Sequence, residues 1–167
     1  MGKYRPYIRD GGKGRYDFTL LHSDPAILKE ITLDLAKPFF DQDIHKVLAL
    51  DAAGLALGTL VAYHLNAGLI FVRKGGRTAW DTRSVEITDY SGKPKTLEIA
   101  IDALSGNDRV LVVDDWSETG TQLKGAISLA EMAGATVIGA AIIGMEDRVL
   151  HDKELSKYIL HALELSN

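Results

Sequence analysis

The segment from Val110 to Gln122 constrains the fold of this chain more than any other. It reads Val-Leu-Val-Val-Asp-Asp-Trp-Ser-Glu-Thr-Gly-Thr-Gln. The apolar run at its start is typical of a strand that is buried on both faces of a parallel sheet. Two carboxylates, Asp114 and Asp115, follow where that strand ends, and a small polar turn then leads into a segment with helical periodicity. A buried strand followed directly by a helix predicts an α/β fold.

The turn after the two acids is suited to hold an anion. The N-terminus of a helix presents unpaired N–H groups and a partial positive charge, so residues 117–121 can bind a phosphate. Asp114 and Asp115 lie beside this turn and can accept hydrogen bonds from hydroxyl groups. Together they suit a ligand that carries both hydroxyls and a phosphate, such as a sugar phosphate. The alternative interpretation is a helix-capping acid beside a buried structural one.

Strands and helices alternate along the rest of the chain, which predicts a mainly parallel sheet. A helix is expected from Pro25 to near Pro38, because a capping side chain and a proline precede an amphipathic pattern. The other predicted elements are strands at 47–50, 69–72, 110–113 and 136–143, and helices at 54–65 and 121–133, the last with Gly134 as its C-cap. A terminal helix is expected from Asp152, because Leu155, Ile159 and Leu163 recur at every fourth residue.

A long polar connection, residues 74–96, separates the two strand–helix–strand units. Connections of this length inside a compact α/β domain are usually functional loops or lids. Part of it, Ser84 to Thr88, can pair as a hairpin.

The composition limits the class of protein. A length of 167 residues predicts one domain, and the lack of cysteine excludes disulfides and thiolate metal sites. A net charge of −4 argues against nucleic-acid binding. No apolar run reaches a membrane span of about 20 residues, and the basic N-terminus lacks the apolar segment of a signal peptide, so we expect a cytoplasmic protein without membrane contact. No P-loop or dinucleotide-binding motif is present, and the histidines lack metal-ligand spacing.

The N-terminus is basic, with Lys3, Arg5, Arg9, Lys13 and Arg15 against Asp10. It is either a solvated, partly flexible segment or a flap that closes over an anionic ligand. Its Tyr7, Tyr16 and Phe18, together with Arg9, either contact a ligand or pack in the fold. Trp116 in the same way either stacks on a ligand or covers the edge of the sheet.

Residues 110–122 resemble the phosphoribosyl-pyrophosphate (PRPP) binding motif of type I phosphoribosyltransferases. In that motif hydrophobic residues, two acids and a Thr-Gly-Gly-Thr turn occur in the same order. Leu69–Lys74 is similar to the strand-plus-Arg-Lys segment of adenine phosphoribosyltransferases. Residues 89–92, followed by 96–99, are similar to the mobile catalytic loop of that branch, and Leu50–Gly54 stands where the family has its pyrophosphate loop. The resemblance covers about residues 46–144.

The phosphate turn departs from the family pattern. Where the family usually has Ala-Thr-Gly-Gly-Thr, this chain has Glu118, Thr119, Gly120, Thr121 and Gln122. Thr121 loses the freedom of a second glycine to adopt a positive φ, whereas Gln122 can still donate a hydrogen bond. Glu118 places a negative charge close to a phosphate site, which is unfavourable unless the side chain points outward or is paired. The changes suggest a divergent branch of the family.

The resemblance implies a type I phosphoribosyltransferase core over about residues 23–145, with a small hood formed by residues 1–22 and 146–167 of a single domain, 1–167. It implies transfer of the ribose 5-phosphate of PRPP to a purine base of the adenine type, with release of pyrophosphate. It also implies a homodimer. Two alternatives stay open: a regulatory protein that binds PRPP without catalysis, and a transferase that acts on another nucleobase.

The resemblance also assigns roles to residues. In this assignment Glu118–Gln122 bind the 5′-phosphate, and Asp114 and Asp115 bind the ribose hydroxyls. The charge of these two acids also favours a developing cation. Mg²⁺ is expected as cofactor, bound through substrate oxygens and with no direct protein ligand beyond these two acids. On the mobile loop, Asp89 would manage the proton of the base and Tyr90 would close over the site. The pyrophosphate residues would be Asp51, Ala52, Ala53, Gly54, Arg73, Lys74 and Arg77. For Arg73 and Lys74 the alternative is an ordinary basic turn.

Overall fold

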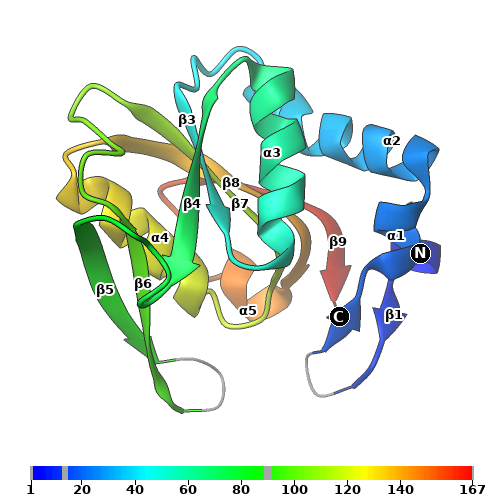
Figure 1. Cartoon of the computed structure of the whole chain (residues 1–167). Coiled ribbons are helices and arrows are strands. Elements are labelled where there is room, and N and C mark those ends of the chain that lie inside the picture. Colours follow the sequence, from blue (N-terminus) through cyan, green and yellow to red (C-terminus); the bar gives the residue numbers. More distant parts are fainter. Residues whose placement is uncertain (1, 13–14, 89–91, 167) are drawn as a thin grey trace.

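A computed structural model describes residues 2–12, 15–88 and 92–166 of the chain (Figure 1). Its strands are β1 (Arg9–Asp10), β2 (Tyr16–Asp17), β3 (Lys46–Leu50), β4 (Gly68–Lys74), β5 (Thr82–Thr88), β6 (Pro94–Ala100), β7 (Arg109–Ser117), β8 (Thr136–Glu146) and β9 (Ile159–Ser166). Its helices are α1 (Thr19–Ser23), α2 (Pro25–Ala36), α3 (Ala53–Leu65), α4 (Thr121–Met132) and α5 (Asp147–Leu150), with short 3₁₀ turns η1 (Arg5–Tyr7) and η2 (Lys37–Phe39).

A seven-stranded sheet forms the centre of the molecule, in the order β5-β6-β4-β3-β7-β8-β9. Its five neighbouring strands β4, β3, β7, β8 and β9 are all parallel. The hairpin of β5 and β6 continues this sheet with antiparallel pairing. The predicted mainly parallel α/β fold is therefore confirmed, and so is the predicted hairpin at residues 84–88. A separate two-stranded ribbon, β1 and β2, lies near the N-terminus.

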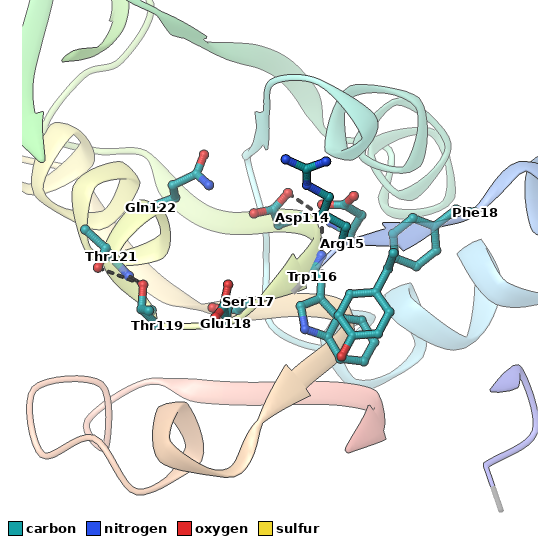
Figure 2. A pocket seen from close by; sticks show the side chains of 12 residues that line it. Arg15, Phe18, Asp114, Trp116, Ser117, Glu118, Thr119, Thr121 and Gln122 are labelled. Atoms are coloured by element: carbon teal, nitrogen blue, oxygen red, sulfur yellow. Dashed lines mark hydrogen bonds between the residues drawn. The ribbon is translucent and has the colours of Figure 1, made fainter. Parts of the chain in front are cut away.

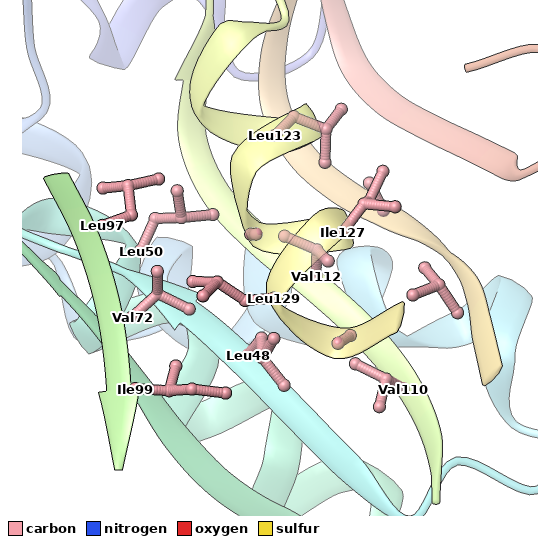
Figure 3. Packing of buried hydrophobic residues seen from close by; sticks show 14 of the residues in the cluster. Leu48, Leu50, Val72, Leu97, Ile99, Val110, Val112, Leu123, Ile127 and Leu129 are labelled. Atoms are coloured by element: carbon pink, nitrogen blue, oxygen red, sulfur yellow. The ribbon is translucent and has the colours of Figure 1, made fainter. Parts of the chain in front are cut away.

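Helices cover both faces of the sheet: α2 and α3 lie on one face and α4 on the other (Figure 1). Side chains alternate between the faces along a strand, so Val110 and Val112 pack under α4 (Figure 3), whereas Leu111 and Val113 pack toward α2 and α3. This double burial is why the run that begins at Val110 contains no polar residue. It also fixes where the apolar part of β7 ends, because the first carboxylates follow directly.

Most predicted elements are confirmed within a few residues. Helix α2 begins at Pro25, and the side chain of Asp24 accepts hydrogen bonds from the backbone N–H groups of Ala26 and Ile27 at 2.9 and 3.1 Å. Gly134 follows the end of α4 with a φ of +80°, a backbone conformation that favours glycine.

The predicted terminal helix is wrong. Residues 159–166 form β9, which pairs in parallel with β8 along the edge of the sheet. Leu160 and Ala162 pack on the α4 side, whereas Leu163 packs on the opposite side, so these apolar residues alternate as in a strand. A spacing of four residues fits the period of a strand as well as that of a helix. Pairing with the edge of β8 selects the strand. The division of the chain into a core and a hood stays a prediction. Strand β9 lies within the residues assigned to the hood, 146–167, but belongs to the central sheet.

Contacts with α2 and β9 anchor the N-terminal segment. The buried Tyr4 donates its backbone N–H to Glu164 at 2.7 Å and its hydroxyl to Asp34 at 2.6 Å. Lys3 lies 2.8 Å from the same Asp34 carboxylate. Of the five basic residues in this segment, Lys3 therefore belongs to the anchor, and Lys13 lies outside the described residues. In the described ranges, no helix has the length and apolarity needed to cross a membrane.

The anchor makes stability depend on pH. Hydrogen bonds from Lys3 and Tyr4 lower the pKa of Asp34 to about 2, below the ordinary value of 3.8. The carboxylate therefore stabilises the fold above about pH 4, and this contribution is lost as the pH falls through about 2. We predict that, as the pH falls from about 4 to about 2, the free energy of unfolding decreases less for Asp34→Asn than for the wild type, as measured by urea denaturation at each pH. Equal losses would contradict the role of Asp34; Asp41→Asn, at an exposed position, is the control.

Candidate active site

The candidate site lies at the carboxyl ends of β4, β3 and β7, which are neighbours in the sheet. Parallel pairing aligns Leu50 with Val72 and Ala49 with Val113, which brings Asp51, Arg73 and Asp114 to one edge. The predicted end of the strand at Val113 is wrong: β7 continues through both acids to Ser117, because it stays paired with β8 beyond the end of β3. Gly54, in the first turn of α3, is packed against the end of β7. A β-carbon there would lie 3.0 Å from the Asp114 carboxylate, so glycine allows this close approach. The sheet thus joins the predicted pyrophosphate loop to the predicted ribose acids.

The two acids near the end of β7 differ in their surroundings. Asp114 is buried, with 6% of its surface exposed, and accepts a hydrogen bond from the backbone N–H of Asp115 at 2.9 Å. Burial, and then the neighbouring charge of Asp115, raise the pKa of Asp114 well above its ordinary range, while the positive charge of Lys74 opposes this shift. A ligand that donates hydrogen bonds or develops positive charge here would relieve the unfavourable burial.

A cavity of about 280 Å³ brings these acids together with the phosphate turn (Figure 2). Its lining residues are Arg15, Tyr16, Phe18, Asp114, Asp115, Trp116, Ser117, Glu118, Thr119, Gly120, Thr121 and Gln122. All predicted ribose and 5′-phosphate residues therefore share one cavity. The predicted pyrophosphate residues lie outside its lining and are joined to it through the contact of Gly54 with Asp114.

The phosphate turn is ordered by its own residues. Gly120 precedes α4 with a φ of +73°, which requires a residue tolerant of left-handed backbone. The hydroxyls of Thr119 and Thr121 are hydrogen-bonded at 2.9 Å. Thr121 is the first residue of α4, so the second glycine of the family pattern is not needed for a positive φ here. The backbone N–H groups at the start of α4 point along the helix axis toward this turn, as an anion requires.

The negative charge of Glu118 is paired. Arg148 of α5 donates from Nε to the backbone oxygen of Glu118 at 2.6 Å and from Nη2 to its carboxylate at 3.2 Å. The condition under which an acid is tolerated next to a phosphate site is therefore met in this chain.

The predicted pyrophosphate residues gather around Asp51. Its side chain, 7% exposed, lies 3.5 Å from Arg73 Nε and 3.2 Å from Arg77 Nη1. Ala52 and Ala53 continue the chain into α3, and the peptide bond between Asp51 and Ala52 is cis. Arg73 and Arg77 are thus paired with the residue that precedes α3, and the pyrophosphate roles of Arg73 and Lys74 stay predictions.

Glu98 is a site residue that the sequence analysis did not single out. This buried side chain in β6 accepts hydrogen bonds from the backbone N–H groups of Gly76, Arg77 and Thr78 at 2.8–3.0 Å. Burial favours the neutral acid, but the N–H donors outweigh it and lower the pKa of Glu98. A lone acid between Leu97 and Ile99 in an alternating strand is the signal that would have found it.

The predicted mobile loop is described only in part. Residues 96–99 belong to strand β6 and pair with β5, so this part of the segment is a strand. The apolar alternation of Leu97 and Ile99, which pack under α4, explains why they form a strand. Asp89 and Tyr90 lie outside the described residues.

Aromatic side chains form the wall opposite the phosphate turn. The rings of Tyr16 and Trp116 are stacked, with centroids 3.7 Å apart. Gly144 of β8 makes room for Trp116, since a β-carbon at that position would overlap the indole. Trp116 therefore packs over the sheet, as the structural alternative predicted, and also lines the cavity. Of the other N-terminal candidates, Phe18 lines the cavity, whereas Arg9 is paired with Asp17 at 3.4 Å.

Comparisons with known proteins agree with this geometry. The family model of the phosphoribosyl transferase domain matches residues 19–159. An adenine phosphoribosyltransferase of Nitrosococcus oceani is 39% identical over 148 residues, which cover 88% of this chain and 85% of the relative. A xanthine phosphoribosyltransferase of Lactobacillus delbrueckii is 37% identical over 124 residues, 72% of this chain and 65% of the relative.

The fold agrees as well. The crystal structure of an adenine phosphoribosyltransferase from Rhodothermus marinus superimposes with a TM-score of 0.89 at 31% identity, covering 97% of this chain and 96% of that one. The strand order, the adjacent acids Asp114 and Asp115, the phosphate turn and these matches have one explanation: the chain belongs to the phosphoribosyltransferase family.

Proposed function

We propose that the protein transfers the ribose 5-phosphate of PRPP to adenine and releases pyrophosphate. The observation that carries this proposal is the shared cavity, which joins the acids Asp114 and Asp115 to the turn at residues 118–122. A sugar phosphate needs hydroxyl acceptors and an anion site within the length of one pentose. The cavity offers both.

The residues suit the charges that this reaction develops. Departure of pyrophosphate leaves positive charge on the ribose ring, and a carboxylate that is costly to bury without a partner stabilises such a charge. The raised pKa of Asp114 indicates that its burial is uncompensated within the protein. Arg73, Lys74 and Arg77 would supply positive charge for the departing pyrophosphate, and Asp89, which lies outside the described residues, would manage the proton of the base.

The relatives support adenine as the base. Proteins named adenine phosphoribosyltransferase recur among the matches, and one relative is named for xanthine. A second purine therefore stands as the alternative substrate. The similarity to named enzymes favours catalysis over the alternative of a binding protein without turnover.

The donor atoms present are compatible with Mg²⁺ carried by the substrate. Asp114 and Asp115 provide carboxylate oxygens, the ligand type that Mg²⁺ prefers. Over the described ranges, no group of at least three His, Cys, Asp or Glu side chains is arranged to hold a metal ion. Oxygens of PRPP would thus supply most of the coordination, and the bound ion would offset the charge of the departing pyrophosphate.

A homodimer is the assembly that we propose. Phe71, Trp80 and Ile101 are large apolar residues that are 45%, 69% and 47% exposed. Phe71 borders a surface hollow of about 430 Å³ together with Ala79, the neighbour of Trp80, and Ala100, the neighbour of Ile101. An exposed apolar region of this kind is typical of a protein–protein interface.

A cytoplasmic location stays a prediction from composition.

A screen of nucleobases tests the reaction. Protein, PRPP and Mg²⁺ should release pyrophosphate with adenine, and the rate should fall to background when EDTA removes the metal. Hypoxanthine, guanine, xanthine and uracil serve as the comparison set. Binding of PRPP without turnover on any base would overturn the enzymatic proposal in favour of a binding protein.

The acid pair is tested by the double substitution Asp114→Asn with Asp115→Asn. Because hydrogen bonds to a charged acceptor contribute roughly 1.5–3 kcal/mol each, we expect PRPP affinity to fall by about 100-fold or more, measured by titration calorimetry. Asp102→Asn, at an exposed turn outside the cavity, should bind PRPP like the wild type. Unchanged affinity of the double variant would reject the site.

The dimer is tested by light scattering coupled to size exclusion. The wild type should show about twice the 18.2 kDa mass of one chain. Trp80→Glu should produce monomers, because it places a charge in the apolar region. Met132→Glu, at an exposed apolar residue on α4, should leave the dimer intact. A monomeric wild type would contradict the proposal.

A further inference from the structure

The proposed 5′-phosphate turn contains an acid of its own. Glu118 lines the same cavity as Thr119, Gly120 and Gln122. A phosphate bound there would carry negative charge, and like charges at this range repel each other. If PRPP binds as proposed above, on which this inference rests, the chain must offset the charge of Glu118.

Arg148 provides that offset through two different atoms of Glu118. Its Nε donates to the backbone oxygen at 2.6 Å, and its Nη2 donates to the carboxylate at 3.2 Å. The backbone contact fixes where the turn begins, and the side-chain contact neutralises the acid and draws it toward α5. One guanidinium can do both because its donors are arranged in a rigid planar fork.

The helix that carries Arg148 is itself packed against the turn. Val149, the next residue, is buried with 1% of its surface exposed. A β-carbon on Gly120 would lie 3.4 Å from Val149 and 3.2 Å from Leu155. Arg148 therefore extends from a support that already touches the phosphate turn, which limits the freedom of both.

A purely structural role explains this pair poorly. The side chain of Arg148 is 59% exposed, and exposed ion pairs contribute little to stability. The pair matters most when a second negative charge approaches Glu118, and that happens only when an anion enters the cavity. Its expected effect is therefore on ligand binding.

We propose that Arg148 is a positioning residue for the 5′-phosphate turn: it neutralises Glu118 and thereby allows the phosphate of PRPP to bind. Arg148 acts through Glu118, so its importance depends on the acid being present.

A double-mutant cycle tests this dependence. Arg148→Ala should raise the KM for PRPP about tenfold with little change in kcat or in the KM for adenine, because the acid is left unneutralised beside the phosphate. Arg148→Lys should have a smaller effect, since it keeps the charge and loses the fork. Glu118→Gln combined with Arg148→Ala should restore most of the PRPP affinity. Lys157→Ala, which removes an exposed ion pair with Glu131, should behave like the wild type.

Titration calorimetry with PRPP and Mg²⁺ alone separates this inference from the proposed function. A wild type that binds PRPP without turning over adenine would defeat the proposed reaction but leave the cycle measurable as dissociation constants. Arg148→Ala that binds PRPP as the wild type does would overturn the inference. So would a loss of affinity on Arg148→Ala that is equally large in the wild-type and Glu118→Gln backgrounds, because the effect of Arg148 would then not pass through the acid.

Discussion

The parallel pairing of β4, β3 and β7 is the interaction on which the site depends. Because these strands run in the same direction, their carboxyl ends lie side by side, and each ends in or is followed by charged residues. Side chains of β3 and β7 are packed in core clusters on both faces of the sheet, so a slip in register would misplace them in two closely packed layers. The positions of Asp51, Arg73 and Asp114 therefore follow from the same packing that stabilises the core.

The acids of the site divide into two kinds. Three carboxylates have partners within the protein: arginines pair with Asp51 and Glu118, and backbone N–H groups donate hydrogen bonds to Glu98. Asp114 is different: within the described part of the chain its carboxylate accepts from a backbone N–H and its pKa is raised by burial. The satisfied acids hold the loops in place, whereas Asp114 gains most from a ligand.

The sequence was sufficient for the fold class, for most elements around β7, and for the two acids and the turn residues 118–122 that share the cavity. These features rest on local patterns, such as an apolar run that ends in two acids. It was insufficient where partners distant in the chain decide. Residues 159–166 form a strand because the edge of β8 is free to pair with them. The role of Glu98 depends on a loop about twenty residues away, and the partner of Glu118 lies 30 residues along the chain.

The central claim is that one cavity binds the ribose and the 5′-phosphate of PRPP together. A crystal structure of the protein with PRPP and Mg²⁺ tests it most directly. We predict the 5′-phosphate within hydrogen-bonding distance of the backbone N–H groups of residues 119–122, and the ribose hydroxyls on the carboxylates of Asp114 and Asp115. PRPP bound elsewhere, with this cavity empty, would contradict the claim.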